Sequence, residues 1–119
     1  MMGKVLLVIS FLLVGAAEAA TAPKRTPELL AKGKAAFNTY CASCHGERGV
    51  GDGAAAAALA SKPRNFAKDK FKQGAKVAQV FETIGKGVPN TPMAPFAYLS
   101  EDDRWALSYW VLELKAGKK

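Results

Sequence analysis

Two cysteines and the single histidine of the chain stand together in Cys41-Ala42-Ser43-Cys44-His45, which has the spacing C-x-x-C-H. This spacing is typical of covalent haem attachment, in which each thiol adds to one vinyl group of a porphyrin. Two intervening residues let both sulfurs reach vinyls on the same edge. The histidine that follows lies under the ring and can present a nitrogen to iron. We therefore expect one covalently bound haem c per chain.

Other uses of such a motif fit the sequence less well. A structural zinc site needs four ligands, and the chain has no second cysteine pair and no further histidine. A thioredoxin-like redox pair belongs beside a βαβ pattern, which is absent from the sequence. A chance occurrence is disfavoured by the amphipathic segment before the motif and the glycine-rich segment after it. The motif thus predicts that Cys41 and Cys44 hold haem and that His45 binds its iron.

The sixth ligand of the iron follows by elimination. Ligation by two histidines of one chain is impossible, and Met93 is the only methionine beyond the first two residues. It lies between two prolines, where a stiff backbone suits a weak thioether ligand. The alternatives are a gap-filling core methionine and Lys86, which can bind iron only when deprotonated at high pH. A His45/Met93 pair raises the reduction potential and fills both axial positions of the iron, which suits electron transfer better than oxygen chemistry.

The first residues have the features of an export signal. Lys4 is followed by an apolar run from Val5 to Val14 and by the A-x-A sequence Ala17-Glu18-Ala19. This pattern predicts a secretory signal peptide over residues 1–19, a mature domain over residues 20–119, and a periplasmic location. An uncleaved anchor is the alternative, but a spanning helix needs about 20 apolar residues, and this run is shorter. We expect no membrane span after cleavage.

Two long helices are expected at the ends of the mature chain. Thr26 is a typical N-cap before a proline, and apolar residues then recur every three or four positions until the chain runs into Cys41. Ser100 is the N-cap expected for the last helix, whose broad apolar surface reaches Lys115. These two helices should enclose the motif and supply most of the core.

The middle of the chain is less regular. A glycine-rich loop follows the motif, with a short helical turn expected over residues 54–58, and Pro63 ends that turn. A further helix is expected over residues 74–84, stopped by Gly85 and Gly87, and a stiff proline-rich loop over residues 88–99. No strand-like alternation extends beyond a few residues. The sequence predicts one all-α domain with three to four helices around one covalent haem.

The chain resembles the class I c-type cytochromes, the small soluble His/Met type, and within them a bacterial branch. Gly33 and Phe37 resemble the family's pair on the first helix, and Leu107 and Trp110 resemble their partners on the last helix. Three segments resemble the bacterial branch: residues 44–53, which run from the motif into the glycine-rich loop, residues 63–66, and residues 87–96 around the methionine. The resemblance implies the cytochrome c fold, with the two helices crossing nearly at right angles.

The resemblance also implies roles for two residues near the haem. A backbone carbonyl in the loop after the motif should accept the second N–H of His45, and Pro63 is the candidate. Arg64 is a candidate for holding a haem propionate, although an exposed surface arginine is an equal alternative.

The charge of the chain indicates which partners it can meet. The formal net charge is +7, spread over many lysines, which would attract an acidic protein surface. An exported protein rarely meets nucleic acid, so we expect none as partner. The leading hypothesis is a monomeric single-electron carrier that is not an enzyme and exchanges electrons with exported or membrane redox proteins. A haem subunit of a larger oxidoreductase is the alternative; an enzyme or gas sensor would need an open iron and polar distal groups.

Overall fold

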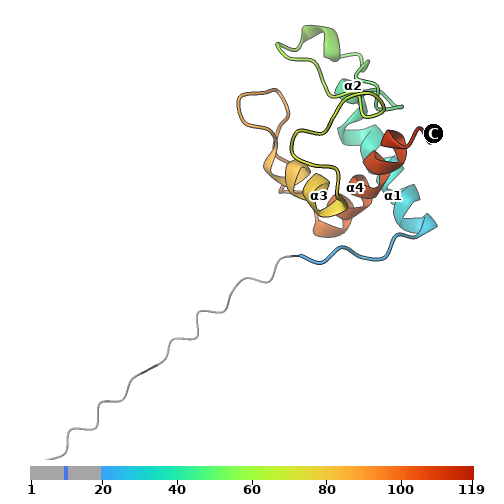
Figure 1. The fold of residues 1–119 in the computed structure, drawn as a ribbon, viewed down its shortest axis with the longest axis vertical. Helices are drawn as coiled ribbons and strands as arrows, with labels where there is room; N and C mark the ends of the chain where they lie inside the picture. The colour runs from blue at the N-terminus through green and yellow to red at the C-terminus, as the bar shows by residue number, and fades with distance from the viewer. Residues whose placement is uncertain (1–9, 11–19) are drawn as a thin grey trace, which may run out of the picture.

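The protein was analysed as a computed structural model, which describes Ser10 and residues 20–119. The predicted signal peptide therefore lies, apart from Ser10, outside the described residues. In the described part the elements follow in the order α1 (Pro27–Tyr40), α2 (Ala42–His45), the 3₁₀ turn η1 (Ala56–Ala58), α3 (Val77–Lys86) and α4 (Glu101–Lys115). Those residues form no strand. The predicted all-α fold with three to four helices is confirmed (Figure 1).

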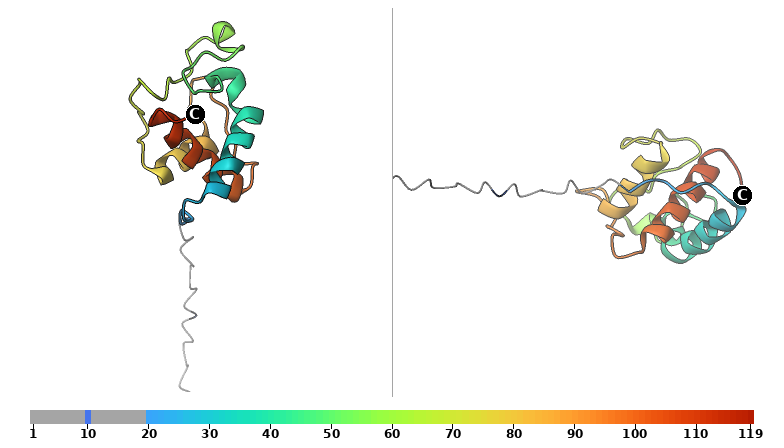
Figure 2. Two further views of the ribbon diagram at one scale, coloured as in Figure 1. Left: turned by 90° about the vertical axis from the view of Figure 1, so that its right-hand side faces the viewer. Right: turned by 90° about the horizontal axis from the view of Figure 1, so that it is seen from below.

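Helices α1 and α4 pack against each other and form the centre of the fold (Figure 2). The predicted caps are confirmed: Thr26 Oγ1 accepts from the Leu29 N–H at 3.1 Å, and Ser100 Oγ accepts from the Asp103 N–H at 3.1 Å. Gly33 marks the contact point, because a Cβ there would lie 2.1 Å from the carbonyl oxygen of Ala106 on α4. The absence of a side chain therefore lets the two backbones touch.

The hydrophobic core lies on both sides of this contact. Phe37 and Leu107 are fully buried, and Trp110 and Leu114 are nearly so. Complete burial of one such side chain stabilises a fold by about 1.5–3 kcal/mol. The residues by which the chain resembles class I cytochromes are thus the residues that join α1 to α4.

Helix α3 differs from the prediction. It begins at Val77, where the Lys76 N–H donates to the side-chain oxygen of Gln79 at 3.0 Å, and it continues to Lys86. The prediction that Gly85 stops the helix was wrong. A Cβ at Gly85 would lie 2.7 Å from Nη1 of Arg104, so this glycine makes room for a guanidinium from α4. Gly87, with φ of +67°, ends the helix as expected.

The motif lies on an element of its own. The first helix ends at Tyr40, the backbone bends at Cys41, and α2 is a single turn. The predicted short turn over residues 54–58 is limited to Ala56–Ala58, with Leu59 as its C-cap, so the prediction that Pro63 ends it was wrong. No helix of the described residues is long and apolar enough to cross a membrane.

Candidate haem-binding site

The turn α2 sets the positions of the two thiols. The N–H groups of Cys44 and His45 both donate to the carbonyl oxygen of Cys41, at 3.2 and 2.9 Å. Residues three apart on a helical turn share one side, so both cysteines face the same direction. Neither cysteine forms a disulfide, and both are half-buried. Two free thiols one turn apart match what attachment to two vinyl groups on one porphyrin edge requires.

The glycine-rich loop folds back onto this turn. The carbonyl oxygens of Ser43, Cys44 and His45 accept from the N–H groups of three residues of the loop, at distances of 2.8, 3.1 and 2.7 Å: Ala55, Gly53 and Gly51. A Cβ at Gly53 would lie 2.3 Å from the carbonyl oxygen of Ser43, so the loop can approach this closely only with glycine there. The motif is therefore held by backbone hydrogen bonds from the loop that follows it.

The imidazole of His45 is oriented by the same loop. Its Nδ1 lies 3.2 Å from the carbonyl oxygen of Arg64. A carbonyl can only accept, so Nδ1 carries the hydrogen, and in the neutral ring Nε2 keeps its lone pair. Burial lowers the pKa of His45, while the hydrogen bond to Arg64 acts in the opposite direction. The neutral form with a free Nε2 is the form that binds iron.

The carbonyl of Arg64 takes the place that we predicted for Pro63. The Pro63 oxygen instead lies against the loop backbone, where a Cβ at Gly51 would come within 2.8 Å of it. The side chain of Arg64 is 36 % exposed, and its Nη1 lies 3.9 Å from Oδ2 of Asp69, beyond hydrogen-bond distance. A propionate contact of this guanidinium stays a prediction, whereas its backbone has a defined contact with His45.

Phe66 contacts the histidine, whereas sequence reasoning placed it in a segment that resembles the bacterial branch and gave it no role. Its ring is stacked on the imidazole of His45 with centroids 4.6 Å apart and 24° between the planes. The ring also meets Phe37 and Phe71 edge-on, at 6.2 and 5.5 Å, and it is only 7 % exposed. The signal available in the sequence was an aromatic residue directly after Pro63-Arg64-Asn65.

The thiol of Cys41 is not prepared for thiolate chemistry. Burial, with a smaller contribution from Cys44, raises its pKa to about 12. Redox-active cysteines of the thioredoxin type instead have lowered pKa values and react as thiolates. Residues 20–119 also bring together no group of three or more His, Cys, Asp or Glu side chains able to hold a metal ion.

Met93 lies on the loop that joins α3 to α4. This loop is stiffened by a turn in which the Val88 N–H donates to the Met93 carbonyl at 3.1 Å, and the Met93 N–H donates to Oγ1 of Thr91 at 3.2 Å. The loop reaches the motif through Phe96, whose ring meets that of Tyr40 edge-on at 6.4 Å. Met93 itself is half-buried. The fold thus brings the methionine loop next to the residue that precedes Cys41.

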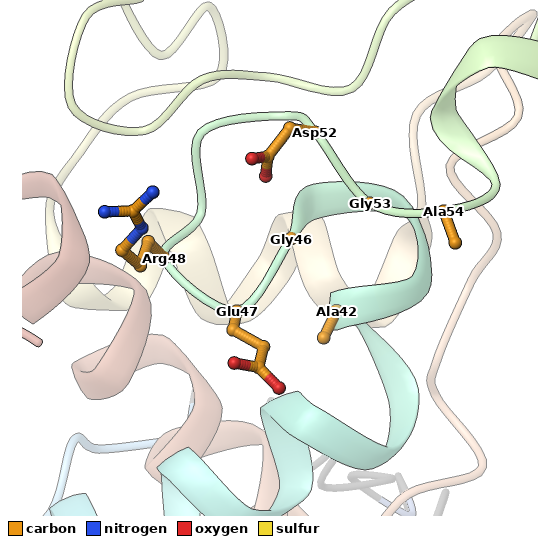
Figure 3. Close-up of a pocket in the computed structure, with 7 residues that line it drawn as sticks. All are labelled: Ala42, Gly46, Glu47, Arg48, Asp52, Gly53 and Ala54. Atoms are coloured by element: carbon orange, nitrogen blue, oxygen red, sulfur yellow. The ribbon is translucent and has the colours of Figure 1, made fainter.

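A polar hollow of about 390 Å³ opens beside the motif (Figure 3). Asp52 points across the loop toward Gly46. A Cβ at Gly46 would lie only 2.0 Å from Oδ1 of Asp52, so the loop has room for this carboxylate only with glycine there. Neither the cysteines nor His45 nor Met93 lines this hollow. Its lining residues are Ala42, Gly46, Glu47, Arg48, Asp52, Gly53 and Ala54.

Comparison with known proteins agrees with this geometry. The family model "Cytochrome c" matches residues 30–115, which include the motif, the methionine loop, most of α1 and all of α4. The chain belongs to the cytochrome c family. This family carries covalent haem c and transfers electrons, and the paired thiols and the free Nε2 of His45 fit that cofactor.

A solved structure is also similar to this cytochrome. A chain of the reducing HAO-like protein complex of Kuenenia stuttgartiensis superposes with a TM-score of 0.76 at 31 % sequence identity. The alignment covers 83 % of the cytochrome and 49 % of that chain, so the cytochrome spans about half of its length. No curated protein matches the sequence.

Proposed function

We propose that this cytochrome is a single-electron carrier whose haem iron is bound by His45 and Met93. The observation that carries the proposal is the hydrogen bond from His45 Nδ1 to the Arg64 carbonyl, because it leaves Nε2 free and directs the ring. A second axial ligand is needed to close the iron, and Met93 is the only methionine of residues 20–119. A closed iron with His/Met ligation is suited to carrying electrons.

The haem supplies a one-electron couple, and the chain supplies its environment. Cys41 and Cys44 hold the porphyrin edge. The Arg64 carbonyl fixes the ring of His45 and increases its basicity, as hydrogen-bond partners of metal-bound histidines do. The turn that joins Val88 to Met93 limits the freedom of a weak thioether ligand. Phe66 fills the space against the imidazole and keeps water from it.

The cellular setting belongs to the same proposal. A signal peptide over residues 1–19 would export the chain to the periplasm, where residues 20–119 would act as a monomer. The chain would belong to the bacterial branch of the class I cytochromes. A net charge of +7 would steer the cytochrome toward acidic surfaces of redox partners.

Optical spectroscopy of the purified holoprotein tests the ligation. The ferric protein should show the weak charge-transfer band in the red that is typical of methionine-ligated haem. Met93→Ala should abolish this band and open the ferrous iron to rapid binding of carbon monoxide. Lys86→Ala is the control and should leave both unchanged. Absence of the band from the wild type, or its retention in Met93→Ala, would contradict the assignment.

A haem subunit of a larger oxidoreductase is the second candidate. It is favoured by the similarity to a chain that is about twice as long and belongs to a complex. Native mass spectrometry of the protein isolated from its own host separates the candidates. A free carrier should give the mass of one chain with one haem, whereas a subunit should retain its partners.

A further inference from the structure

The positive charge of the cytochrome is concentrated in one segment. Residues 62–76, called the basic loop below, contain six basic residues and one acid, a net charge of +5 out of the total of +7. Residues 77–119 contain five basic and five acidic residues and are neutral overall. The basic loop runs from the motif side of the molecule to the start of α3 (Figure 1). The charge is thus strongly asymmetric along the chain.

The lysines of the basic loop are available to a partner. Five of them are exposed, and none is within ion-pair distance of an acid of the described residues: Lys62, Lys68, Lys70, Lys72 and Lys76. Four basic side chains outside the basic loop have an acidic neighbour within ion-pair distance: Arg25, Lys32, Lys86 and Lys118. An unpaired cluster of this kind produces a local positive field that attracts acidic surfaces.

The inner side of the basic loop is anchored and is joined to the histidine ligand. Phe66 stacks on the ring of His45, and Arg64 supplies the carbonyl that accepts from it. Phe71 is half-buried under Lys115, whose Nζ lies 4.5 Å from the centre of the ring. A partner that sits on the lysines therefore lies next to the residues that contact His45.

The methionine loop itself carries no charge. Residues 87–100, which include Met93, contain no charged residue. Their exposed aromatic side chain is Tyr98, which is 73 % exposed. Charge can therefore guide a partner to the histidine side but not to the methionine loop.

We propose that the basic loop is the docking surface for an acidic redox-partner protein. The proposal rests on the proposed function as an electron carrier and specifies where its partner binds. Charged residues at such a surface raise the association rate and orient the partner while the contact stays transient. A protein is favoured over an anionic membrane because Phe66 and Phe71 point inward, so the loop exposes no large apolar side chain for insertion into lipid.

Charge reversal with a matched control tests the docking surface. The variant Lys70→Glu/Lys72→Glu alters the basic loop, and Lys24→Glu/Lys119→Glu changes the net charge by the same amount at exposed positions elsewhere. Binding of each holoprotein to poly-L-glutamate is measured at low ionic strength. The loop variant should bind about ten-fold more weakly and the control about two-fold more weakly than the wild type. Lys70→Arg/Lys72→Arg should bind like the wild type.

Three further measurements decide the outcome. In ¹⁵N–¹H NMR spectra, poly-L-glutamate should shift the amides of residues 62–76 most. Equal loss of binding in both charge-reversal variants, or absence of binding by the wild type, would overturn the proposal. So would binding to vesicles that contain phosphatidylglycerol without binding to poly-L-glutamate. Reduction by ascorbate should be the same in all variants, because failure there would contradict the electron-carrier function instead of the docking surface.

Discussion

The imidazole of His45 and the backbone of Arg64 are joined by a hydrogen bond of 3.2 Å, in which Nδ1–H donates to the carbonyl oxygen. Because the acceptor is a backbone atom, substitution of the Arg64 side chain should leave this contact in place. The orientation of the histidine ligand therefore depends on the path of the loop between Gly46 and Phe66. The same loop also holds the motif through backbone hydrogen bonds to its carbonyl oxygens.

Gly87 controls the position of the methionine loop. It has φ of +67°, and a Cβ there would lie 2.7 Å from the carbonyl oxygen of Met93. Gly87→Ala should displace the loop, weaken the charge-transfer band of the ferric holoprotein and increase the rate of carbon monoxide binding to the ferrous form. Gly117→Ala is the matched control, because Gly117 has φ of +80° and no atom within 4 Å of a Cβ. An unchanged band in Gly87→Ala would argue against Met93 as ligand.

Gly33 permits the contact between α1 and α4. A Cβ there would lie 2.1 Å from the carbonyl oxygen of Ala106 and 3.0 Å from Cβ of Trp110. Gly33→Ala should therefore force the helices apart and destabilise the holoprotein by about 1–3 kcal/mol or more, although alanine favours helices. Asn38→Ala, at an exposed position of the same helix, is the control and should change stability little. Urea denaturation followed by haem absorbance measures both.

The long helices could be predicted because their signals are local. Thr26 and Ser100 are N-caps that act on residues three positions away, and the apolar spacing of three and four describes one helical face. The motif was recognisable for the same reason, since all its residues lie within one turn. Local sequence signals were therefore sufficient to predict α1, α4 and the haem-attachment residues.

Other features depend on residues that are distant in the sequence. Gly85 was predicted to stop a helix, but its role is set by Arg104, which packs against it from α4. The acceptor for His45 was predicted at Pro63, but the choice between adjacent carbonyls depends on how a glycine-rich loop turns. The stack of Phe66 on His45 likewise joins residues that no local pattern connects.

Phe66 should contribute to both stability and ligand geometry. Phe66→Ala would remove a ring that touches His45, Phe37 and Phe71, and such truncations cost about 3–5 kcal/mol. Phe66→Leu keeps most of the volume and should cost less than about 1.5 kcal/mol. Both variants lose the stack, so NMR of the ferric holoprotein should show shifted resonances of the His45 ring in each. Unshifted resonances in Phe66→Leu would show that the stack does not position the imidazole.

Glu113 should make stability dependent on pH. Burial raises its pKa, but hydrogen bonds and ion pairs from Arg25 and Lys118 outweigh this effect, and the net pKa is lowered. A carboxyl whose pKa is lower in the folded state stabilises the protein above its unfolded-state pKa, because the unfolded chain binds more protons below that value. This stabilisation should be fully present at neutral pH. It should be lost as the pH falls below the usual carboxyl range and through the lowered pKa.

The contribution of this cluster can be isolated by comparing unfolding free energies at neutral and at acidic pH. Glu113→Gln should lower the free energy of unfolding by about 1 kcal/mol at neutral pH, as expected for ion pairs whose basic partners are exposed, and by less at acidic pH. Glu47→Gln, which removes an exposed carboxylate without an ion pair among the described residues, should shift the curve little. An equal loss of unfolding free energy in Glu113→Gln at both pH values would show that packing, and not charge, holds Arg25 against α4.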